Sequence, residues 1–174
     1  MSVKAGLPTN KNQLSQLGFQ FRVKKLPTTN FFVTRVTLPG LMGSVPGVAT
    51  PFKIMPMAYD KLEYGDLQVT FKVDEDMKNW MEVFDWMVGI GFPTKFDERR
   101  LLEANKSTAE GKFSDGSLTV MTSAKNPNIQ FMFKDLIPYS LSDLDFTTQD
   151  MDVNYLEATV SFKYLYYTIE NRKP

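Results

Sequence analysis

The sequence contains no cysteine and no histidine. Disulfide bonds, thiolate nucleophiles and zinc sites of the Cys/His type are therefore excluded. The Ser-His-Asp and Cys-His mechanisms of nucleophilic catalysis are excluded for the same reason. A carboxylate pair or a carboxylate-only metal site remains possible, although the commonest general base of enzymes is missing.

The sequence also has no excess of either charge, because 20 Lys and Arg residues balance 20 Asp and Glu residues. Stable non-specific binding to nucleic acid usually shows as a basic excess. A chain near zero net charge has little self-repulsion, and this favours association. The charge balance therefore disfavours a nucleic-acid-binding surface and is compatible with assembly.

Long hydrophobic runs are missing too. No run approaches the roughly 20 apolar residues needed to cross a bilayer, and the N-terminus has no apolar core or cleavage pattern of a signal peptide. We expect a soluble protein made in a cytoplasm. The 174 residues suit one domain with its own core. We expect a polar arm over residues 1–17, either mobile or held by another surface, and a single β domain over residues 18–174.

The first half of the domain begins with strand patterns. Residues 19–26 (FQFRVKKL) alternate apolar and polar side chains, which predicts a half-buried strand. Residues 27–30 (PTTN) predict a turn, so residues 19–26 and 31–38 are expected to form a hairpin. The second strand, FFVTRVTL, is apolar on both faces. Such a strand lies between two packed layers or meets another subunit.

Residues 41–66 are too long and too apolar for an ordinary connection. Their hydrophobicity argues against disorder. Exposed apolar loops mark interaction sites, and methionine adapts well to imperfect partners. We interpret this segment as a projecting loop that contacts a partner, in preference to a loop folded back on its own core. Residues 52–58 are a possible strand with a proline on its edge.

A strand over residues 67–73 and one amphipathic helix follow. The strand alternates, with Leu67, Val69, Phe71 and Val73 on the expected core face. Asp74 is expected to be the N-cap of the helix, and Gly89 and Gly91 to end it. Its apolar residues recur at i, i+3, i+4 and i+7 spacing, which predicts that they pack on the core and cap the open face of a sheet. These residues are Met77, Trp80, Met81, Phe84, Met87 and Val88, and Val83 and Trp86 widen the stripe.

The next part of the chain is expected to contain a second hairpin. Residues 95–113 are charged and indicate a solvated loop or a short helix. Asp115-Gly116 indicates a turn. Residues 118–123 and 129–135 flank KNPN, which predicts two strands joined by a turn.

The C-terminal part is expected to begin with a turn at residues 137–139 (IPY) and to end in one long strand over residues 156–170. The second half of that strand is apolar on both faces, so we expect it to meet a neighbour. Five acids and no basic residue occur from residue 143 to residue 157, namely Asp143, Asp145, Asp150, Asp152 and Glu157. Their spacing matches no calcium loop. They form a solvated acidic surface or line a passage in which like charge keeps nucleic acid from sticking.

No motif of an enzyme is present. The sequence has no P-loop, no dinucleotide-binding glycine pattern, no nucleophile elbow and no internal repeat. Nothing in the sequence indicates an active site, and we expect no enzymatic activity, no cofactor and no metal.

The order of these elements resembles the tail tube proteins of contractile-tailed bacteriophages over roughly residues 18–170. A hairpin ends in LPG at Leu38-Pro39-Gly40, and a long loop returns through a Pro- and Met-rich edge. A strand, the helix DEDMKNWMEVFDWM, a further hairpin and a terminal strand with YLYY follow.

The resemblance implies a mainly β (α+β) fold, a small antiparallel β-sandwich or barrel flanked by one helix. It also implies homohexameric rings that stack into a hollow tube in the virion tail. The partners would be further copies of the chain, the sheath protein, the tape-measure protein and a baseplate tube initiator. Genome DNA would pass through the lumen without sequence-specific binding. The candidate contact residues between subunits and rings are Leu38, Pro39, Gly40, Val45, Phe52, Ile54, Tyr164, Tyr166 and Tyr167.

Alternatives within the same class are a baseplate tube initiator, a tail-terminator ring and a tube subunit like those of type VI secretion. From other classes, a small protein-binding module would use the apolar loop and never form rings or tubes. A histidine-free hydrolase or lyase would need acids from residues 143–157 to converge in a cleft.

Overall fold

The computed structural model describes residues 12–91, 93–95, 98, 102, 111–149 and 154–171. These residues are mostly in antiparallel strands, which confirms the expected mainly β fold with one long helix. The strands are β1 (Phe19–Val23), β2 (Val33–Thr37), β3 (Leu41–Gly43), β4 (Gly47–Ala49), β5 (Ile54–Pro56), β6 (Leu62–Tyr64), β7 (Leu67–Lys72), β8 (Ser114–Met121), β9 (Pro127–Leu141), β10 (Glu157–Lys163) and β11 (Tyr166–Asn171), and the helices are α1 (Thr29–Phe32) and α2 (Lys78–Gly91).

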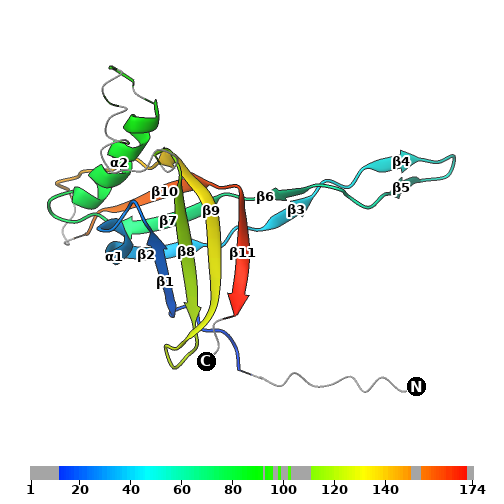
Figure 1. Cartoon of the computed structure of the whole chain (residues 1–174), viewed down its shortest axis with the longest axis horizontal. Helices are drawn as coiled ribbons and strands as arrows, with labels where there is room; N and C mark the ends of the chain where they lie inside the picture. The colour runs from blue at the N-terminus through cyan, green and yellow to red at the C-terminus, as the bar shows by residue number, and fades with distance from the viewer. Residues whose placement is uncertain are drawn as a thin grey trace.

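The large sheet has the order β1-β8-β9-β10-β7-β2, with β11 also paired to β9. Strand β9 belongs to two layers: Lys134 pairs with Tyr166 of β11, and Ile137 pairs with Lys163 of β10. Asp135 lies between them at a φ of 56°, a bend that redirects the strand. Strands β1, β8, β9 and β11 therefore cross in front of β10, β7 and β2 at a steep angle (Figure 1).

The core lies between these two layers. Phe71 on β7, Phe133 on β9 and Phe162 on β10 are fully buried. The alternation expected for residues 67–73 is confirmed, because Leu67 and Val69 are buried while Gln68 is exposed. Each fully buried large apolar side chain contributes about 1.5–3 kcal/mol to folding, and the core therefore holds the two layers together.

The expected hairpin of residues 19–26 and 31–38 is wrong. Strand β1 pairs with β8, and β2 pairs with β7. The segment between β1 and β2 is held by side-chain hydrogen bonds. The Asn30 side chain accepts a hydrogen bond from Val23 N–H and donates one to the Val23 carbonyl oxygen, both at 2.9 Å. The Thr29 hydroxyl donates to the Asn79 carbonyl oxygen at 3.0 Å. Residues 29–32 therefore form α1 against α2, and the predicted strand begins only at Val33.

The hairpin around KNPN is confirmed as β8–β9, but both turns expected near it are wrong. Asp115 and Gly116 lie within β8. A Cβ on Gly116 would lie 2.3 Å from Leu136 Cδ1, so this glycine serves a close approach of two strands. Pro138 lies within β9 next to a register shift, where a strand tolerates proline.

The long final strand expected over residues 156–170 is two strands. Ala158, Val160 and Phe162 of β10 are buried, which confirms the core face. The chain then leaves the strand conformation at Tyr164 and Leu165, and β11 pairs with a different part of β9.

Helix α2 begins at Lys78, later than an N-cap at Asp74 would place it. Asp74 still receives the hydrogen bond of a cap, because its Oδ1 accepts from Asn79 N–H at 3.2 Å. The helix continues through Gly89 and ends at Gly91, the second of the two glycines expected to stop it. A Cβ on Gly89 would lie 2.7 Å from Leu102 Cγ, so this glycine makes room for a packed side chain.

The apolar stripe expected to face the core does so in part: Val83 and Trp86 are buried in the core, and Trp80 and Met87 pack against it half-buried. The residues of α2 that are buried are Asn79, Val83, Trp86 and Gly89. Trp86 donates its Nε1 proton to the Lys112 carbonyl oxygen at 3.0 Å and packs on Phe162. Met81 and Phe84 of the predicted stripe are each 44% exposed. The helix is apolar on more than one side, and only part of that surface is used by the core.

Candidate subunit interfaces

Strands β3 to β6 form an arm, residues 41–64, that projects far from the body of the molecule (Figure 1). Strand β3 pairs with β6 near the body, and β4 pairs with β5 further out. The expected projecting segment is therefore a β ribbon, and β5 lies within the strand suggested for residues 52–58.

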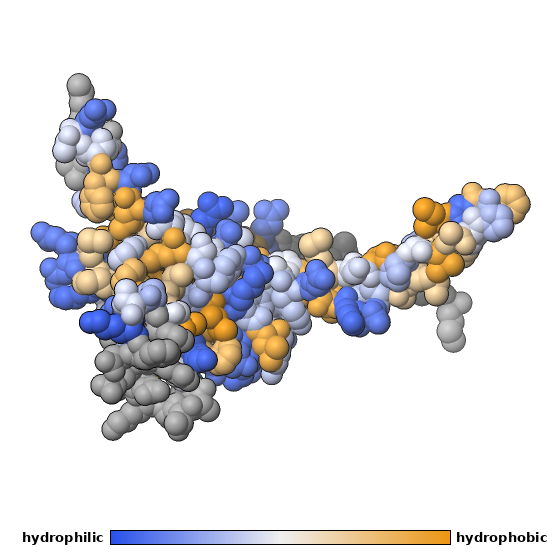
Figure 2. Space-filling view, turned by 90° about the horizontal axis from the view of Figure 1, so that it is seen from above, coloured by the Kyte–Doolittle hydropathy of each residue, from blue (hydrophilic) through white to orange (hydrophobic). Residues whose placement is uncertain are grey.

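The arm exposes apolar side chains out to its tip (Figure 2). Phe52 is 98% exposed and Ile54 is 73% exposed. Val45 is exposed as well. An apolar ribbon that its own chain leaves uncovered is an interaction surface or an aggregation liability.

The tip of the arm is closed by a compact turn. Thr50 N–H donates to the Lys53 carbonyl oxygen at 3.0 Å, and Thr50 Oγ1 accepts from Lys53 N–H at 3.2 Å. Behind the turn, Ile54 lies over Gly47, and Tyr59 lies over Gly43. These contacts order the ribbon internally, so that Phe52 is presented at the outermost point of a fixed turn.

The base of the arm is tied to the body. Asp66 accepts a hydrogen bond from Tyr139 Oη at 2.5 Å and forms an ion pair with Lys163. The hydrogen bond from Lys163 and then the one from Tyr139 hold the pKa of Asp66 below its ordinary value. Gly65 N–H donates to the Gly40 carbonyl oxygen at 3.0 Å, which closes the ribbon where it enters the sheet.

An aromatic cluster supports the same base. The Tyr64 ring lies 5.8 Å from Tyr164 and 5.5 Å from Tyr167, both edge to face. The Tyr164 ring also lies 5.2 Å from Phe133 of the core. Burial of the Tyr164 hydroxyl, with the neighbouring Tyr167 and Tyr64, raises the pKa of Tyr164 to about 12.

The nine residues proposed as contacts therefore lie in three places. Val45, Phe52 and Ile54 are exposed on the arm. Leu38, Pro39 and Gly40 are at its root, where Pro39 is buried. Tyr164 and Tyr167 pack within their own subunit, and Tyr166 is 41% exposed. Their role as contacts between subunits remains a prediction for all nine.

A second candidate surface is the layer formed by β1, β8, β9 and β11. Strands β1 and β11 are its two outer strands, and in the part of the chain that the structure describes neither pairs on its outer side. The two edges have similar lengths, five residues in β1 and six in β11. Unpaired edges of this kind are ready to pair with another chain.

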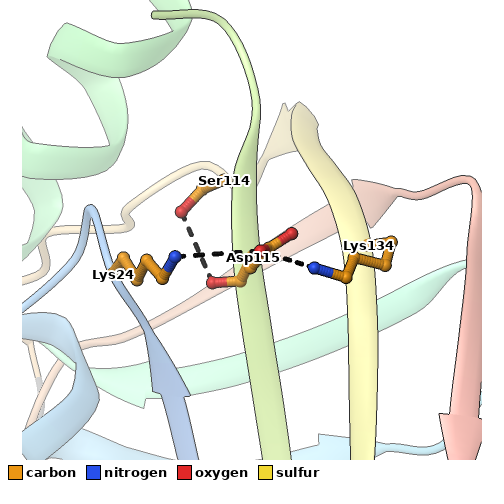
Figure 3. Close-up of polar contacts among 4 residues, drawn as sticks. All are labelled: Lys24, Ser114, Asp115 and Lys134. Carbon is orange, nitrogen blue, oxygen red and sulfur yellow. Dashed lines mark hydrogen bonds and ion pairs between the residues drawn. The ribbon is translucent and has the colours of Figure 1, made fainter. Parts of the chain in front are cut away.

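The outer face of this layer is polar. Asp115 on β8 lies 2.9 Å from Lys134 Nζ and 3.8 Å from Lys24 Nζ, and Ser114 contacts its backbone (Figure 3). Burial opposes the ionisation of Asp115, but the hydrogen bond and charge of Lys134, the Asp135 backbone and the charge of Lys24 together outweigh burial and hold the pKa of Asp115 below its ordinary value. Sequence reasoning missed this cluster because it assigned Asp115 to a turn.

A third candidate is an open groove between α2 and the segment that follows β9, with a volume of ≈ 740 Å³. Trp80 and Phe84 of α2 stack with ring centroids 5.2 Å apart and line one side. Leu144 and Phe146 line the other side. Sequence reasoning missed the groove because it assigned this face of α2 to the core.

The acidic segment shows no site. Asp143, Asp145 and Glu157 are exposed, and Asp150 and Asp152 lie outside the described residues. Among the residues that are described, no three acids lie close enough together to hold a metal ion. The segment over residues 95–113 also lies mostly outside the described part, and no helix within that part is long and apolar enough to cross a membrane.

The sequence matches no family model and no curated protein. The structure, in contrast, is similar to solved structures. A chain of the anti-feeding prophage tube-terminating cap has a TM-score of 0.65 at 10% identity, covering 98% of this chain and 99% of that one. A chain of the extended sheath–tube complex of an extracellular contractile injection system has a TM-score of 0.62 at 11% identity, covering 92% and 93%. Hcp1 from Flavobacterium johnsoniae has a TM-score of 0.50 at 14% identity, covering 87% and 94%.

These similarities define the class of fold. The chain has the fold shared by tube and cap proteins of contractile injection systems. The resemblance to tail tube proteins is confirmed at the level of the fold, on nearly the whole length of the chain. At such low identity the likeness shows the fold alone, and function has to be argued from the surfaces described above.

Proposed function

We propose that this protein is a structural subunit of the tube of a contractile phage tail or a related injection system. The fold supports this role, because its relatives include a chain solved in a sheath–tube complex. The absence of His and Cys from the sequence supports a structural role over an enzymatic one.

The observation that carries the proposal is the pair of open edges, β1 and β11, at opposite sides of one four-stranded layer. When β11 of one copy pairs with β1 of the next, the contact is heterologous and closes into a ring if the rotation per copy is right. Six copies would form the ring, and the joined layers would make a continuous cylindrical sheet without edges.

The polar face of this layer is the proposed wall of the lumen. Two of its cations, Lys24 and Lys134, share the carboxylate of Asp115, and Arg22 lies exposed on the same face. Pairing of lysines with a carboxylate reduces the positive charge that the wall presents to a polyanion, and this favours passage of DNA without retention. The sheath protein would lie outside the tube, and the tape-measure protein and genome DNA would pass inside. A baseplate initiator would start the tube.

The test is electron microscopy in negative stain over a series of protein concentrations, with sedimentation velocity in parallel. We expect hollow rings of uniform bore that stack into tubes as the concentration rises. A particle that sediments as a monomer at every concentration would contradict the proposal and favour the binding module.

A terminal ring is the second candidate. The similar structures include chains of a tube-terminating cap and of a sheath/tube terminator, which match this chain as well as the chain from the sheath–tube complex does, with TM-scores of 0.65, 0.62 and 0.62. The same experiment separates the two roles. A tube subunit stacks into tubes of variable length, whereas a terminator stops at single or paired rings because one of its faces blocks further stacking.

A further inference from the structure

We propose that the tip of the arm of one copy inserts into the groove between α2 and the segment after β9 of another copy. This inference rests on the proposed function, since it names the partner surface that the arm would use in the assembly. It assigns the groove, which sequence reasoning did not identify, as a receptor for a second copy of the chain.

The positions of the two surfaces require an intermolecular contact. The arm and α2 lie toward opposite ends of the longest axis of the molecule (Figure 1). The arm therefore points away from the groove of its own chain and cannot fill it. Two different surfaces that fit each other, at opposite ends of one molecule, produce a head-to-tail contact that repeats from copy to copy.

The two surfaces match in apolar character. The groove is lined by aromatic and aliphatic side chains, including Trp80, Phe84 and Phe146, and Phe146 is 72% exposed. The tip presents Phe52 on a turn that hydrogen bonds already fix. An aromatic anchor that enters an apolar pocket is the usual centre of a binding interface, and a fixed turn loses little conformational entropy on docking.

The two surfaces also match in charge. Lys53, next to Phe52, is the only charged residue between residues 41 and 59. Among the described residues that line the groove, Asp143 is the only charged one. Both side chains are exposed in the single chain. With Phe52 in the groove, Lys53 lies at its rim, where Asp143 is the carboxylate available to it. One opposite pair in otherwise apolar surfaces sets the direction of docking.

The test uses the natural absence of cysteine. A Pro51→Cys protein is mixed with a Thr147→Cys protein under assembly conditions and treated with a short bis-maleimide. Both positions are exposed neighbours of Phe52 and Phe146, so the two aromatic side chains of the contact stay in place. We expect a cross-linked dimer in the mixture and not in either protein alone. The matched control replaces Thr147→Cys by Asn126→Cys, in the β8–β9 turn far from α2 (Figure 1), and should give no dimer. A dimer from Pro51→Cys alone would show an arm–arm contact and overturn the proposal.

A charge exchange provides the second arm of the test. Lys53→Asp and Asp143→Lys should each raise the concentration needed for assembly by about tenfold, and the double variant should restore it. Lys61→Asp on the arm and Asp145→Lys beside the groove are matched controls and should change it less than about twofold. A different result is that the unmodified protein forms tubes while the cross-linked dimer does not form and the charge exchange has no effect. That result would overturn this inference and leave the proposed tube function standing. Absence of any ring or tube would instead overturn the function, and this contact with it.

Discussion

The carboxylate of Asp66 accepts a hydrogen bond from Tyr139 Oη at 2.5 Å, and this contact joins the base of the arm to β9. Lys163 of β10 forms an ion pair with the same carboxylate. Three residues from separate parts of the chain thus fix the direction in which the arm leaves the sheet. A surface that docks into a partner gains from such fixing, because less conformational entropy is lost on binding.

Tyr139→Phe is therefore predicted to loosen the arm without unfolding the domain. Amide exchange at Gly65, whose N–H bonds to Gly40, should speed up by about two- to fivefold, as for the loss of one exposed hydrogen bond. Asp66→Asn should do the same, whereas Asp60→Asn, also on an exposed part of the arm, should not. Unchanged exchange at Gly65 in both variants would show that the arm is fixed by the aromatic cluster alone.

The same contact predicts a dependence on pH. The pKa of Asp66 is lowered in the folded chain from the ordinary value of 3.8. Its stabilising effect is therefore complete above pH 3.8 and is lost as the pH falls through the lowered folded-state value. A carboxyl titration of Asp66 by NMR should show the midpoint below 3.8, and in Tyr139→Phe the midpoint should rise.

Tyr164 leads to a prediction at alkaline pH. Its hydroxyl is buried and has no hydrogen-bond partner in the described part of the chain. Because the folded-state pKa is about 12 against an ordinary 10, the folded state loses stability as the pH rises from 10 to about 12. Tyr164→Phe should remove this loss and should keep or raise stability at neutral pH by up to about 1 kcal/mol. Urea unfolding at pH 7 and pH 11 measures both effects, and a clear loss at pH 7 would mean that the hydroxyl has a partner.

Gly116 gives a prediction about the core. Gly116→Ala would place a Cβ 2.3 Å from Leu136 Cδ1, and Leu136 is fully buried. The substitution should cost about 1–3 kcal/mol of unfolding free energy, as overpacking does. Gly111→Ala, where nothing lies within 4 Å, should cost far less. The double variant Gly116→Ala/Leu136→Ala should cost less than the sum of its parts, and strict additivity would contradict the contact.

Local patterns identified most strands because alternation reports which face is buried. Residues 67–73 and the start of the last strand show this, since Val69 and Val160 lie on the expected core faces. Pairing was harder to predict. Strands β1 and β2 look like a hairpin because a turn joins them, but side-chain bonds from Thr29 and Asn30 direct the connection toward α2 and the end of β1. Such long-range contacts leave no periodic signal in the sequence.

The arm and the groove differ in how far sequence could predict them. The arm was found because 26 consecutive residues, 41–66, were too apolar for a loop. The groove was not predicted, because α2 is apolar on two sides and the periodicity does not indicate which side packs against the sheet. Trp86 is the more deeply buried of the two tryptophans, because it reaches both Phe162 and the Lys112 carbonyl oxygen, whereas Trp80 packs half-buried on the core and also lines the groove.

The last prediction concerns the tip of the arm in assembly. Phe52 and Ile54 are exposed in the single chain, so Phe52→Asp/Ile54→Asp should change the unfolding free energy by only about 0.5 kcal/mol. In the assembly the two carboxylates would have to enter an apolar contact, and the concentration needed to form tubes should rise by at least about 100-fold. Sedimentation velocity and electron microscopy measure this.

The matched control for that variant is Phe31→Asp/Tyr155→Asp, which puts two acids at exposed aromatic positions outside the arm. This control should form tubes at close to the concentration that the unmodified protein needs. The net charge changes equally in both variants, and only the positions of the two added acids differ. If the arm variant forms tubes at the unmodified concentration, the arm tip is not an assembly surface. If both variants fail alike, added negative charge and not the loss of the apolar tip explains the failure, because like charges repel between copies.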